Sequence, residues 1–392
     1  MIRRPRCPLD GWIWELVTFP HNLSERQGDV PPGETALNGK RQPTIIDVAR
    51  LSGVSKTTVA RVLSGVGAVH AETRRRVEEA VRQSGYERNH LAFGLRTGRS
   101  RMMGLVIPDI SNPFWADLAR GAQDRAEAEK RSLLIFSSDW DAERERRHLQ
   151  ALRQARVDGI ILNPATDDRG LLRQTEAPVV VIGSSGERFP EFSSVRSDVA
   201  QGVRLALDYL IAAGHRHIGL INGRDRRVAR TRFVTEAQAH WQRHGFDPAS
   251  LPMDEGDYTA DSGQAATHRL IEREGGRMTA VFAANDLMAV GGILAARAAG
   301  RSCPRDISIM GMDGVEAGGF TDPGLTTVDK PRYDMGVHAM RQLQAEIDGE
   351  AEIVHTVLPC RVVERASVAA PPAAALHSVR PPAARAVRKK SA

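Results

Sequence analysis

Lysine, threonine and arginine recur at helical spacing in residues 44–65, TIIDVARLSGVSKTTVARVLSG. Lys56 and Thr57 open the second of two amphipathic runs in this stretch, and Arg61 follows Thr57 by one helical turn, so the three side chains would share an outward face. Side chains of these types can hydrogen-bond to the edges of bases in the major groove of DNA. We therefore predict that Lys56, Thr57 and Arg61 contact bases.

The same stretch predicts the elements that would position these residues. Thr44 is the expected N-cap of a first helix and Ser55 that of a second, and Gly53 would end the first helix between them. Two short helices joined by a tight turn form a helix-turn-helix, although an ordinary helical hairpin with a solvated face shows the same pattern. Apolar residues at helical spacing would pack the helices together: Ile45, Val48, Ala49, Leu51, Val59, Val62 and Leu63.

Written as T-I-x-D-V-A-x-x-x-G-V-S-x-x-T-V-x-R-V-L, the stretch resembles the headpiece of the LacI/GalR family of bacterial repressors. The resemblance continues through TRRRVEEAVRQSGY at residues 73–86, and motifs such as FAANDLMAVG at 282–291 and TDPGLTTVDKP at 321–331 extend it to about residue 370. It implies a homodimeric, sequence-specific transcriptional regulator, most often a repressor. Its partners would be double-stranded operator DNA and a small-molecule effector that controls operator affinity.

The resemblance also implies roles for residues around the base-contacting face. A hinge helix after the headpiece would enter the minor groove, where Leu95 would wedge a base step. This chain departs from the family pattern at Arg88, Phe93 and Gly94, and glycine in a helix costs about 0.5–1 kcal/mol relative to alanine. We therefore expect a hinge helix that forms less readily, with a plain linker as the alternative. Contacts to phosphates are expected from Thr44, Ser55, Thr58 and Ser64.

From Met102 onward, predicted strands such as GLVIP at 104–108 alternate with predicted helices, which indicates doubly wound parallel sheets. About 270 residues exceed one sheet of ordinary width, so two subdomains are expected. We expect a multidomain chain, with an all-α helix-turn-helix headpiece before an α/β domain that the resemblance identifies as periplasmic-binding-protein-like. The expected segments are a disordered N-terminal extension (1–43), the headpiece (44–86), a hinge helix or linker (87–100), the effector-binding domain (101–370; N-subdomain 101–183 and 328–354, C-subdomain 184–327 and 355–370) and a disordered basic tail (371–392).

Ligands of such folds bind in the crevice beyond the carboxyl ends of the strands. The first predicted strand delivers Asp109, Phe114 and Trp115 to that edge, and the aromatic rings could stack on a sugar or a base, or one of them could pack in the core. The effector is expected to be carbohydrate-like. Five arginines in residues 223–232 are compatible with an anionic ligand or with a solvated helix face. The resemblance adds four residues to the site: Arg232, Asn285, Asp313 and Lys330.

Positive charge is concentrated at the two ends of the chain, although the net charge is only +6. Residues 44–99 hold ten lysines and arginines against five acids, and residues 371–392 hold five basic residues and no acid. Residues 1–43 add +1, which leaves residues 100–370 at −5 by difference. A phosphate backbone would therefore attract the predicted headpiece rather than the bulk of the chain.

Two other functional classes are compatible with a doubly wound sheet: an enzyme and a solute-binding receptor without DNA binding. The sequence lacks the common motifs of phosphate-binding loops, nucleophile elbows and zinc proteases, so we expect no catalytic residues, no metal site and no cofactor. His215 and His217 lie beside a predicted strand and are expected to pack or cap. Three scattered cysteines, no apolar run of membrane-spanning length and no secretory signal favour a cytoplasmic protein that does not contact a membrane.

Overall fold

The computed structural model describes residues 43–64, 68–86, 99–223, 228–350 and 352–373. The chain forms two compact units, residues 1–87 and residues 88–392. The expected N-terminal extension, most of the expected linker with Leu95, and most of the expected tail lie outside the described residues.

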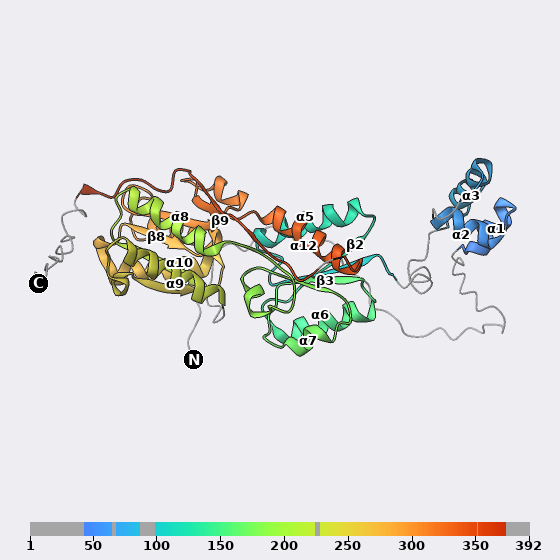
Figure 1. Cartoon of the computed structure of the whole chain (residues 1–392). Coiled ribbons are helices and arrows are strands. Elements are labelled where there is room, and N and C mark those ends of the chain that lie inside the picture. The colour runs from blue at the N-terminus through green and yellow to red at the C-terminus, as the bar shows by residue number, and fades with distance from the viewer. Residues whose placement is uncertain (1–42, 65–67, 87–98, 224–227, 351, 374–392) are drawn as a thin grey trace, which may run out of the picture. The chain divides into compact units, whose positions relative to one another are not determined.

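The described residues of the smaller unit form three helices, as predicted: α1 (Ile45–Ser52), α2 (Lys56–Ser64) and α3 (Ala71–Ser84) (Figure 1). Its core consists of the buried side chains of Val48, Val59, Val62, Val77 and Ala80. The prediction that Leu51 packs in this core is wrong, because Leu51 is 56% exposed. Ser52, one turn after Val48, lies on the buried face of α1 instead, and its hydroxyl donates to the Val48 carbonyl at 2.7 Å.

Local capping interactions set the ends of these helices. Thr44 caps α1, and its backbone N–H and hydroxyl both donate to the carboxylate of Asp47, at 2.9 and 2.7 Å. Gly53 ends α1 in the left-handed conformation at φ 65°, which costs glycine little. The Ser55 hydroxyl then accepts from the backbone N–H of Thr58 at 3.1 Å and starts α2. His70 makes no side-chain cap at the start of α3, as its type predicts.

The larger unit contains two sheets of six strands each, which confirms the predicted doubly wound fold. The first sheet is parallel throughout and has the order β11-β5-β4-β3-β1-β2. The second has the order β12-β10-β9-β8-β6-β7, and β12 is antiparallel to β10. The strands of the first sheet are β1 (Met102–Ile107), β2 (Ser132–Ser137), β3 (Gly159–Leu162), β4 (Val179–Ile182), β5 (Ser194–Ser197) and β11 (His355–Leu358). Those of the second are β6 (Ile218–Gly223), β7 (Met253–Gly256), β8 (Ala280–Ala283), β9 (Ser308–Asp313), β10 (Thr326–Asp329) and β12 (Arg361–Val363).

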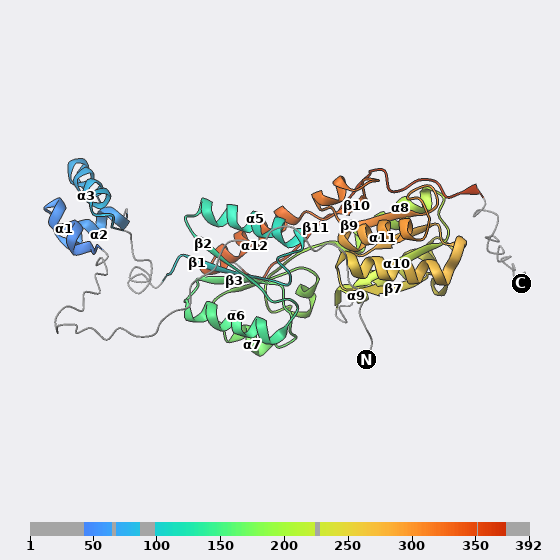
Figure 2. The same ribbon diagram turned by 180° about the vertical axis from the view of Figure 1, so that it is seen from behind.

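Helices cover both faces of each sheet and bury the apolar strands (Figures 1 and 2). On the first sheet, α5 (Pro113–Ala128) and α12 (Arg332–Ile347) pack on one face, and α6 (Ala142–Gln154) and α7 (Arg169–Arg173) on the other. On the second, α8 (Val199–Ala212) and α9 (Val228–Arg243) pack opposite α10 (Ala260–Glu274) and α11 (Asp286–Ala298). The described part of this unit also has four 3-10 turns: η1 (Ser184–Arg188), η2 (Pro248–Ser250), η3 (Gly275–Arg277) and η4 (Glu316–Phe320).

Within the described residues the chain crosses between the sheets three times; the first crossing comes later than predicted, and the other two lie close to the predicted residues. The crossing expected near Gly183 follows Ser197 instead, because β5 pairs with β4 and extends the first sheet after η1. The crossing expected near Val328 follows Asp329, the last residue of β10. The third, expected near His355, follows β11. The first subdomain is therefore longer than 101–183 and 328–354, since it takes in β5 and β11.

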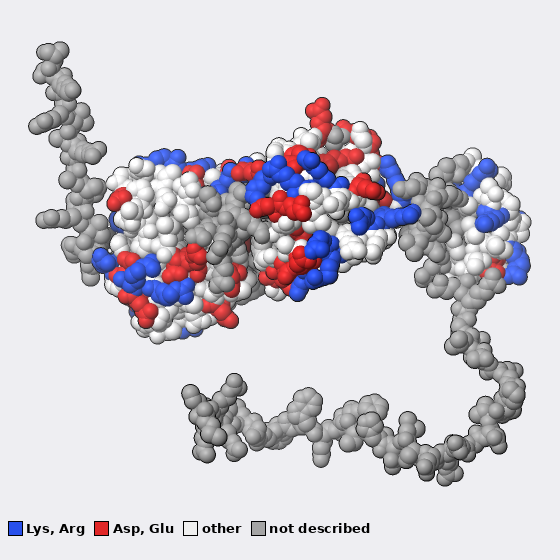
Figure 3. All heavy atoms as spheres, turned by 90° about the horizontal axis from the view of Figure 1, so that it is seen from below, with Lys and Arg blue, Asp and Glu red and all other residues white. Residues whose placement is uncertain are grey.

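The surface of the larger unit mixes both signs of charge. Figure 3 shows lysine and arginine side chains interleaved with aspartate and glutamate on one face. Surface ion pairs account for part of this pattern, such as Arg269 with Asp254 at 2.7 Å. Among the described residues, no helix is both long and apolar enough to cross a membrane.

Candidate nucleic-acid interface and ligand crevice

The outward face of α2 carries the predicted base-contacting residues. Lys56, Thr57 and Arg61 are exposed, while Val59 and Val62 of the same helix are buried. The helix therefore separates a polar and cationic face from an apolar one. Such a face has the donors and acceptors that the major groove requires.

Of the residues predicted to contact phosphates, Ser55, Thr58 and Ser64 lie near the ends of the same helix and Thr44 lies at the start of α1. Several of their hydroxyls are already in use. Ser55 is exposed, caps α2, and shares a hydrogen bond of 2.9 Å with the Thr58 hydroxyl. The Thr44 hydroxyl is bonded to Asp47. Ser64 ends α2, and its side chain, like Leu95, lies outside the described residues.

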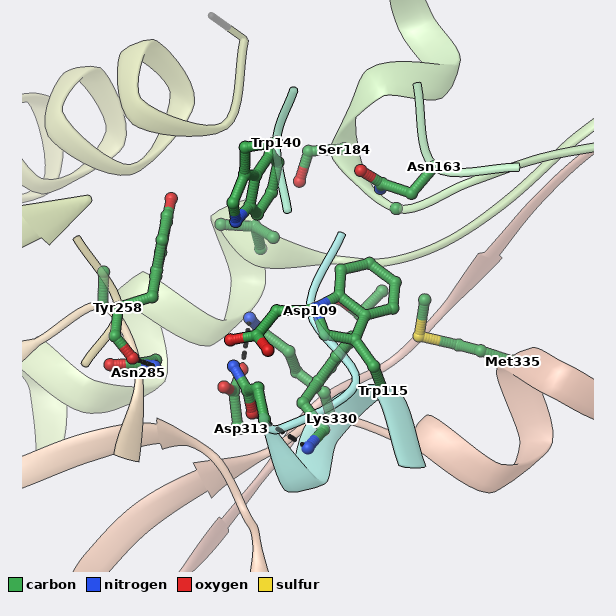
Figure 4. A pocket seen from close by; sticks show the side chains of 16 residues that line it. Asp109, Trp115, Trp140, Asn163, Ser184, Tyr258, Asn285, Asp313, Lys330 and Met335 are labelled. Atoms are coloured by element: carbon green, nitrogen blue, oxygen red, sulfur yellow. Dashed lines mark hydrogen bonds and ion pairs between the residues drawn. The ribbon is translucent and has the colours of Figure 1, made fainter. Parts of the chain in front are cut away.

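A crevice lies between the two sheets, at the carboxyl ends of their strands (Figure 4). It encloses about 750 Å³ of empty space, part of it open to solvent. Residues that follow β1, β3, β4 and β5 line it on the first side, and residues that follow β8, β9 and β10 line it on the other. Six of the seven predicted effector-site residues are among the lining residues: Asp109, Phe114, Trp115, Asn285, Asp313 and Lys330.

The first wall of the crevice is aromatic. Asn112 caps α5 by accepting from the backbone N–H of Phe114 at 3.0 Å, which fixes the start of the helix. The Phe114 and Trp115 rings then meet edge to face, with centroids 4.9 Å apart. Both are less than 9% exposed and belong to the core around β1, yet both also border the cavity. The same two rings thus pack in the hydrophobic core and line the cavity.

The opposite wall is polar and buried. Asp313 ends β9, and its carboxylate accepts from the Lys330 ammonium at 2.8 Å. Burial raises the pKa of Asp313, and the neighbouring Lys330 opposes that shift. Asp286 lies behind it, accepts from the backbone N–H of Val315 at 2.7 Å, and has its pKa raised to about 7 by burial and by the charge of Asp313.

Two of the predicted residues have structural partners that limit their roles. Asn285 caps α11 by accepting from the Met288 N–H at 2.9 Å and donates to the Tyr258 carbonyl at 2.9 Å, so both ends of its amide are engaged. Arg232 is not among the lining residues, and its guanidinium pairs with Glu187 of η1. Glu187 also pairs with Arg196 of β5 at 3.1 Å, so one carboxylate links the first subdomain to α9.

Sequence reasoning missed two aromatic residues at the crevice. Trp140 follows β2 and Tyr258 follows β7, and their rings stack with centroids 5.9 Å apart and an interplanar angle of 19°. Both border the cavity and both have positive φ, 59° and 70°. Trp140 lies just after a predicted strand, the same signal that identified Trp115, whereas no strand was predicted before Tyr258. Nothing in the sequence pairs two segments that are more than a hundred residues apart.

Asn163 was also missed, and it lies beside Gly183. Its amide nitrogen donates to the Ile182 carbonyl at 2.7 Å, while its buried Oδ1 has no hydrogen-bond partner and the residue borders the cavity. A Cβ on Gly183 would lie 2.6 Å from the Asn163 Nδ2. Asn163 thus occupies the space that a side chain at position 183 would need.

His215 packs rather than binds a ligand, as expected. Its ring is buried and lies within 2.9 Å of the Thr279 hydroxyl and 3.1 Å of the Ser308 hydroxyl. Burial lowers its pKa to about 4, so the ring is neutral near pH 7.

Two family descriptions match the chain: bacterial regulatory proteins of the lacI family over residues 44–89, and a periplasmic binding protein-like domain over residues 207–368. Catabolite control protein A of Priestia megaterium is 35% identical and covers 83% of this chain and 98% of its own. The ribose operon repressor of Halalkalibacterium halodurans is 34% identical, with 78% and 90% covered.

Two solved structures are similar along most of the chain. The Lac repressor dimer bound to operator and the anti-inducer ONPF has a TM-score of 0.75 and 27% identity, and 84% of this chain and 100% of that chain are covered. A complex of the transcriptional regulator CelR with cellobiose has a TM-score of 0.63 and 29% identity, with 83% and 100% covered.

Proposed function

The chain belongs to the LacI family of bacterial regulatory proteins, and on that premise we propose that it is a transcriptional repressor released from, or fixed on, its operator by a small molecule in the crevice. The observation that carries this proposal is the exposed face of α2, where Lys56, Thr57 and Arg61 project from a helix held by buried valines. Related repressors that match over most of their length supply the context.

On DNA, we propose that Lys56, Thr57 and Arg61 touch base edges in the major groove. The N-terminal turns of α1 and α2 would meet phosphates, because exposed backbone N–H groups there attract anions. Thr44, Ser55 and Thr58 mark those positions, Ser64 would meet a phosphate at the other end of α2, and Leu95 would wedge the minor groove. A related Lac repressor binds operator as a dimer. A homodimer of this chain would likewise present two headpieces to a near-palindromic operator.

The crevice favours a neutral, hydroxyl-rich effector. Trp115, Trp140 and Tyr258 provide aromatic surface for the apolar face of a sugar ring, and the unpartnered Asn163 Oδ1 can accept from a hydroxyl. Among the described lining residues, the Lys330 cation is already paired with Asp313. Related regulators have been solved with cellobiose and ribose. The anionic ligand considered from the arginines of 223–232 has less support, since Arg232 is paired with Glu187.

Effector binding would act through the angle between the two subdomains. A ligand that contacts both walls stabilises the closed arrangement only to the extent that it binds the closed arrangement more tightly than the open one. The change would reach the headpieces through the segment after residue 86. By linkage, operator DNA must then alter effector affinity by the same factor. We further propose that the protein works in the cytoplasm without catalysis or a resident cofactor, as its regulator relatives suggest.

The proposal is tested with the full chain and the promoter region of its own gene. Footprinting should reveal a protected, nearly palindromic site that survives competition by random DNA. A panel of neutral and phosphorylated sugars is then titrated while tryptophan fluorescence is followed, since Trp115 and Trp140 line the crevice. A chain that shows no preference for any promoter fragment, with or without these sugars, would contradict the proposal.

A further inference from the structure

Two histidines and an aspartate converge where α8 packs on α9, outside the crevice. The Nε2 atoms of His240 and His244 lie 2.6 and 2.9 Å from the same Oδ1 atom of Asp208, and 3.2 Å from each other. His240 lies in the last turn of α9 and His244 directly follows the last residue of that helix, and their rings meet edge to face at 4.8 Å. These three ligand-type atoms all lie within 4.8 Å of one another.

The same three atoms can be held by hydrogen bonds or by a cation. If each imidazole donates its Nε2 proton to Asp208, the two N–H groups converge on one carboxylate oxygen, with their nitrogens 3.2 Å apart. If one imidazole presents a lone pair instead, that lone pair lies beside the carboxylate oxygen. A cation at the point of convergence would give all three lone pairs a partner at once.

We propose that Asp208, His240 and His244 form a binding site for a divalent transition-metal ion, with zinc as the favoured ion. Two imidazoles and one carboxylate are ligands that suit zinc, and three protein ligands leave a fourth position open to water. Zinc bonds of about 2.0–2.1 Å in a tetrahedron place ligand atoms roughly 3.3 Å apart. The present separations of 2.6–3.2 Å need to widen by less than an ångström. Asp208 and His244 are at the surface and can move, while the buried His240 anchors the site.

The charges around the cluster define its second layer. Arg243 lies 3.2 Å from the Nδ1 atom of His240 and 2.6 Å from Glu236, which also pairs with Arg204 of α8 at 3.1 Å. A histidine that binds metal through Nε2 carries its proton on Nδ1, where it needs an acceptor. Metal binding would therefore turn Arg243 away from the ring and wholly toward Glu236. The positive charge of Arg243 opposes a cation nearby, so its removal should tighten binding.

The site is distinct from the effector crevice. Helix α8 starts with Val199, which borders the crevice, and Asp208 lies nine residues further along, about 14 Å at 1.5 Å per residue. A bound ion would join the far parts of α8 and α9 and would not compete with a ligand in the crevice. The expected role is therefore to hold these two helices together over the second sheet.

Calorimetric titration of the metal-free, untagged full chain with zinc chloride tests the proposal. The wild type should bind one zinc ion. His244→Ala and Asp208→Asn each remove a ligand and should lower the zinc affinity by more than about tenfold. His268→Ala is the matched control, because His268 is an exposed histidine with a single carboxylate neighbour, Glu272 at 3.4 Å. Circular dichroism establishes that each variant is folded.

Two further measurements separate a metal site from a hydrogen-bonded cluster. Binding should weaken as the solution is acidified, because an imidazole must be deprotonated to bind a metal ion. Cobalt should give a visible absorption band that His244→Ala abolishes, and Arg243→Gln should bind zinc more tightly than the wild type. Zinc binding that is absent from the wild type, or equal in the wild type, His244→Ala and Asp208→Asn, would overturn the proposal.

Discussion

On α2 the side chains proposed to contact DNA project into solvent, whereas in the crevice Asp313, Lys330 and Asn285 are bonded to protein groups and mostly buried. The headpiece therefore needs only a stable three-helix scaffold for its face to be available, and that scaffold has a small core. The crevice holds its polar groups in fixed positions by partners from several strands, over much larger cores. Substitutions should therefore abolish DNA binding mainly by unfolding the headpiece, and should weaken effector binding mainly by removing individual contacts in the crevice.

The largest expected effect follows from the small headpiece core. Val59→Asp places an unpaired charge at a fully buried position, at a cost of about 3–5 kcal/mol. The headpiece should unfold and operator binding should vanish, while the larger unit retains its thermal transition and its effector affinity. Calorimetry together with a DNA-binding assay measures both. Loss of the larger unit's transition would show that the two units do not fold independently.

The next prediction concerns a buried group in the larger unit. His215 has a folded-state pKa of about 4 against 6.5 for a free imidazole. The unfolded chain therefore takes up a proton first, and the wild type loses stability as the pH falls from about 6.5 toward 4, by up to about 3 kcal/mol from this group.

His215→Gln removes that proton uptake. The variant should be less stable than the wild type at pH 7, because it loses hydrogen bonds of the buried ring. The difference between the two should shrink as the pH falls through this window, as measured by urea denaturation at several pH values. A difference that is constant with pH would mean that His215 titrates alike in both states.

Arg61→Ala tests the headpiece face without disturbing its scaffold. If Arg61 makes a bidentate base contact, the loss is about 1–3 kcal/mol and is confined to particular operator bases. Binding to a set of single-base operator variants measures this. Arg75→Ala is the control, since Arg75 is an exposed arginine of α3 paired with Glu72. An equal loss on every sequence would make Arg61 a phosphate contact.

The smallest expected effect belongs to the crevice. Trp140→Ala removes one half of the aromatic pair with Tyr258, and effector affinity should fall by about 0.5–1.5 kcal/mol beyond the loss of contact area. Operator binding without effector should be unchanged. Phe320→Ala is a control at an aromatic residue that is 81% exposed and away from the cavity lining. An unaltered effector affinity in Trp140→Ala would place the ligand deeper, against Trp115.

The two regions also differ in how far the sequence predicts them. The caps at Thr44, Gly53 and Ser55 and the outward face of α2 depend on residues within a few positions of one another, so local patterns identify them. Leu51 was misplaced because two adjacent helix positions compete for the inner face and only packing decides between them. In the larger unit, alternation identified the sheets, but β5 is four residues long and was not recognised, which displaced the first crossing.

Six of the sixteen residues that line the crevice were predicted. Asp109, Phe114 and Trp115 were expected because residues at the carboxyl ends of parallel strands must meet, and Asn285, Asp313 and Lys330 were expected from the resemblance to the family. Trp140, Tyr258 and Asn163 were not, since their importance comes from partners distant in the chain. The same holds for Asp208, which joins His240 and His244 only through the packing of α8 on α9. Arg232 shows the converse, because alignment with the family gave it a role in the crevice while the fold gives it Glu187 as a partner.

The close approach of Gly183 to Asn163 has a consequence for redesign. A side chain at position 183 would collide with the amide of Asn163, and the backbone at Gly183 has φ 78°. A single substitution at position 183 therefore cannot introduce a new ligand-binding side chain into this crevice. Positions 163 and 183 would have to be exchanged together, because the side chain of one occupies the space that the other would need.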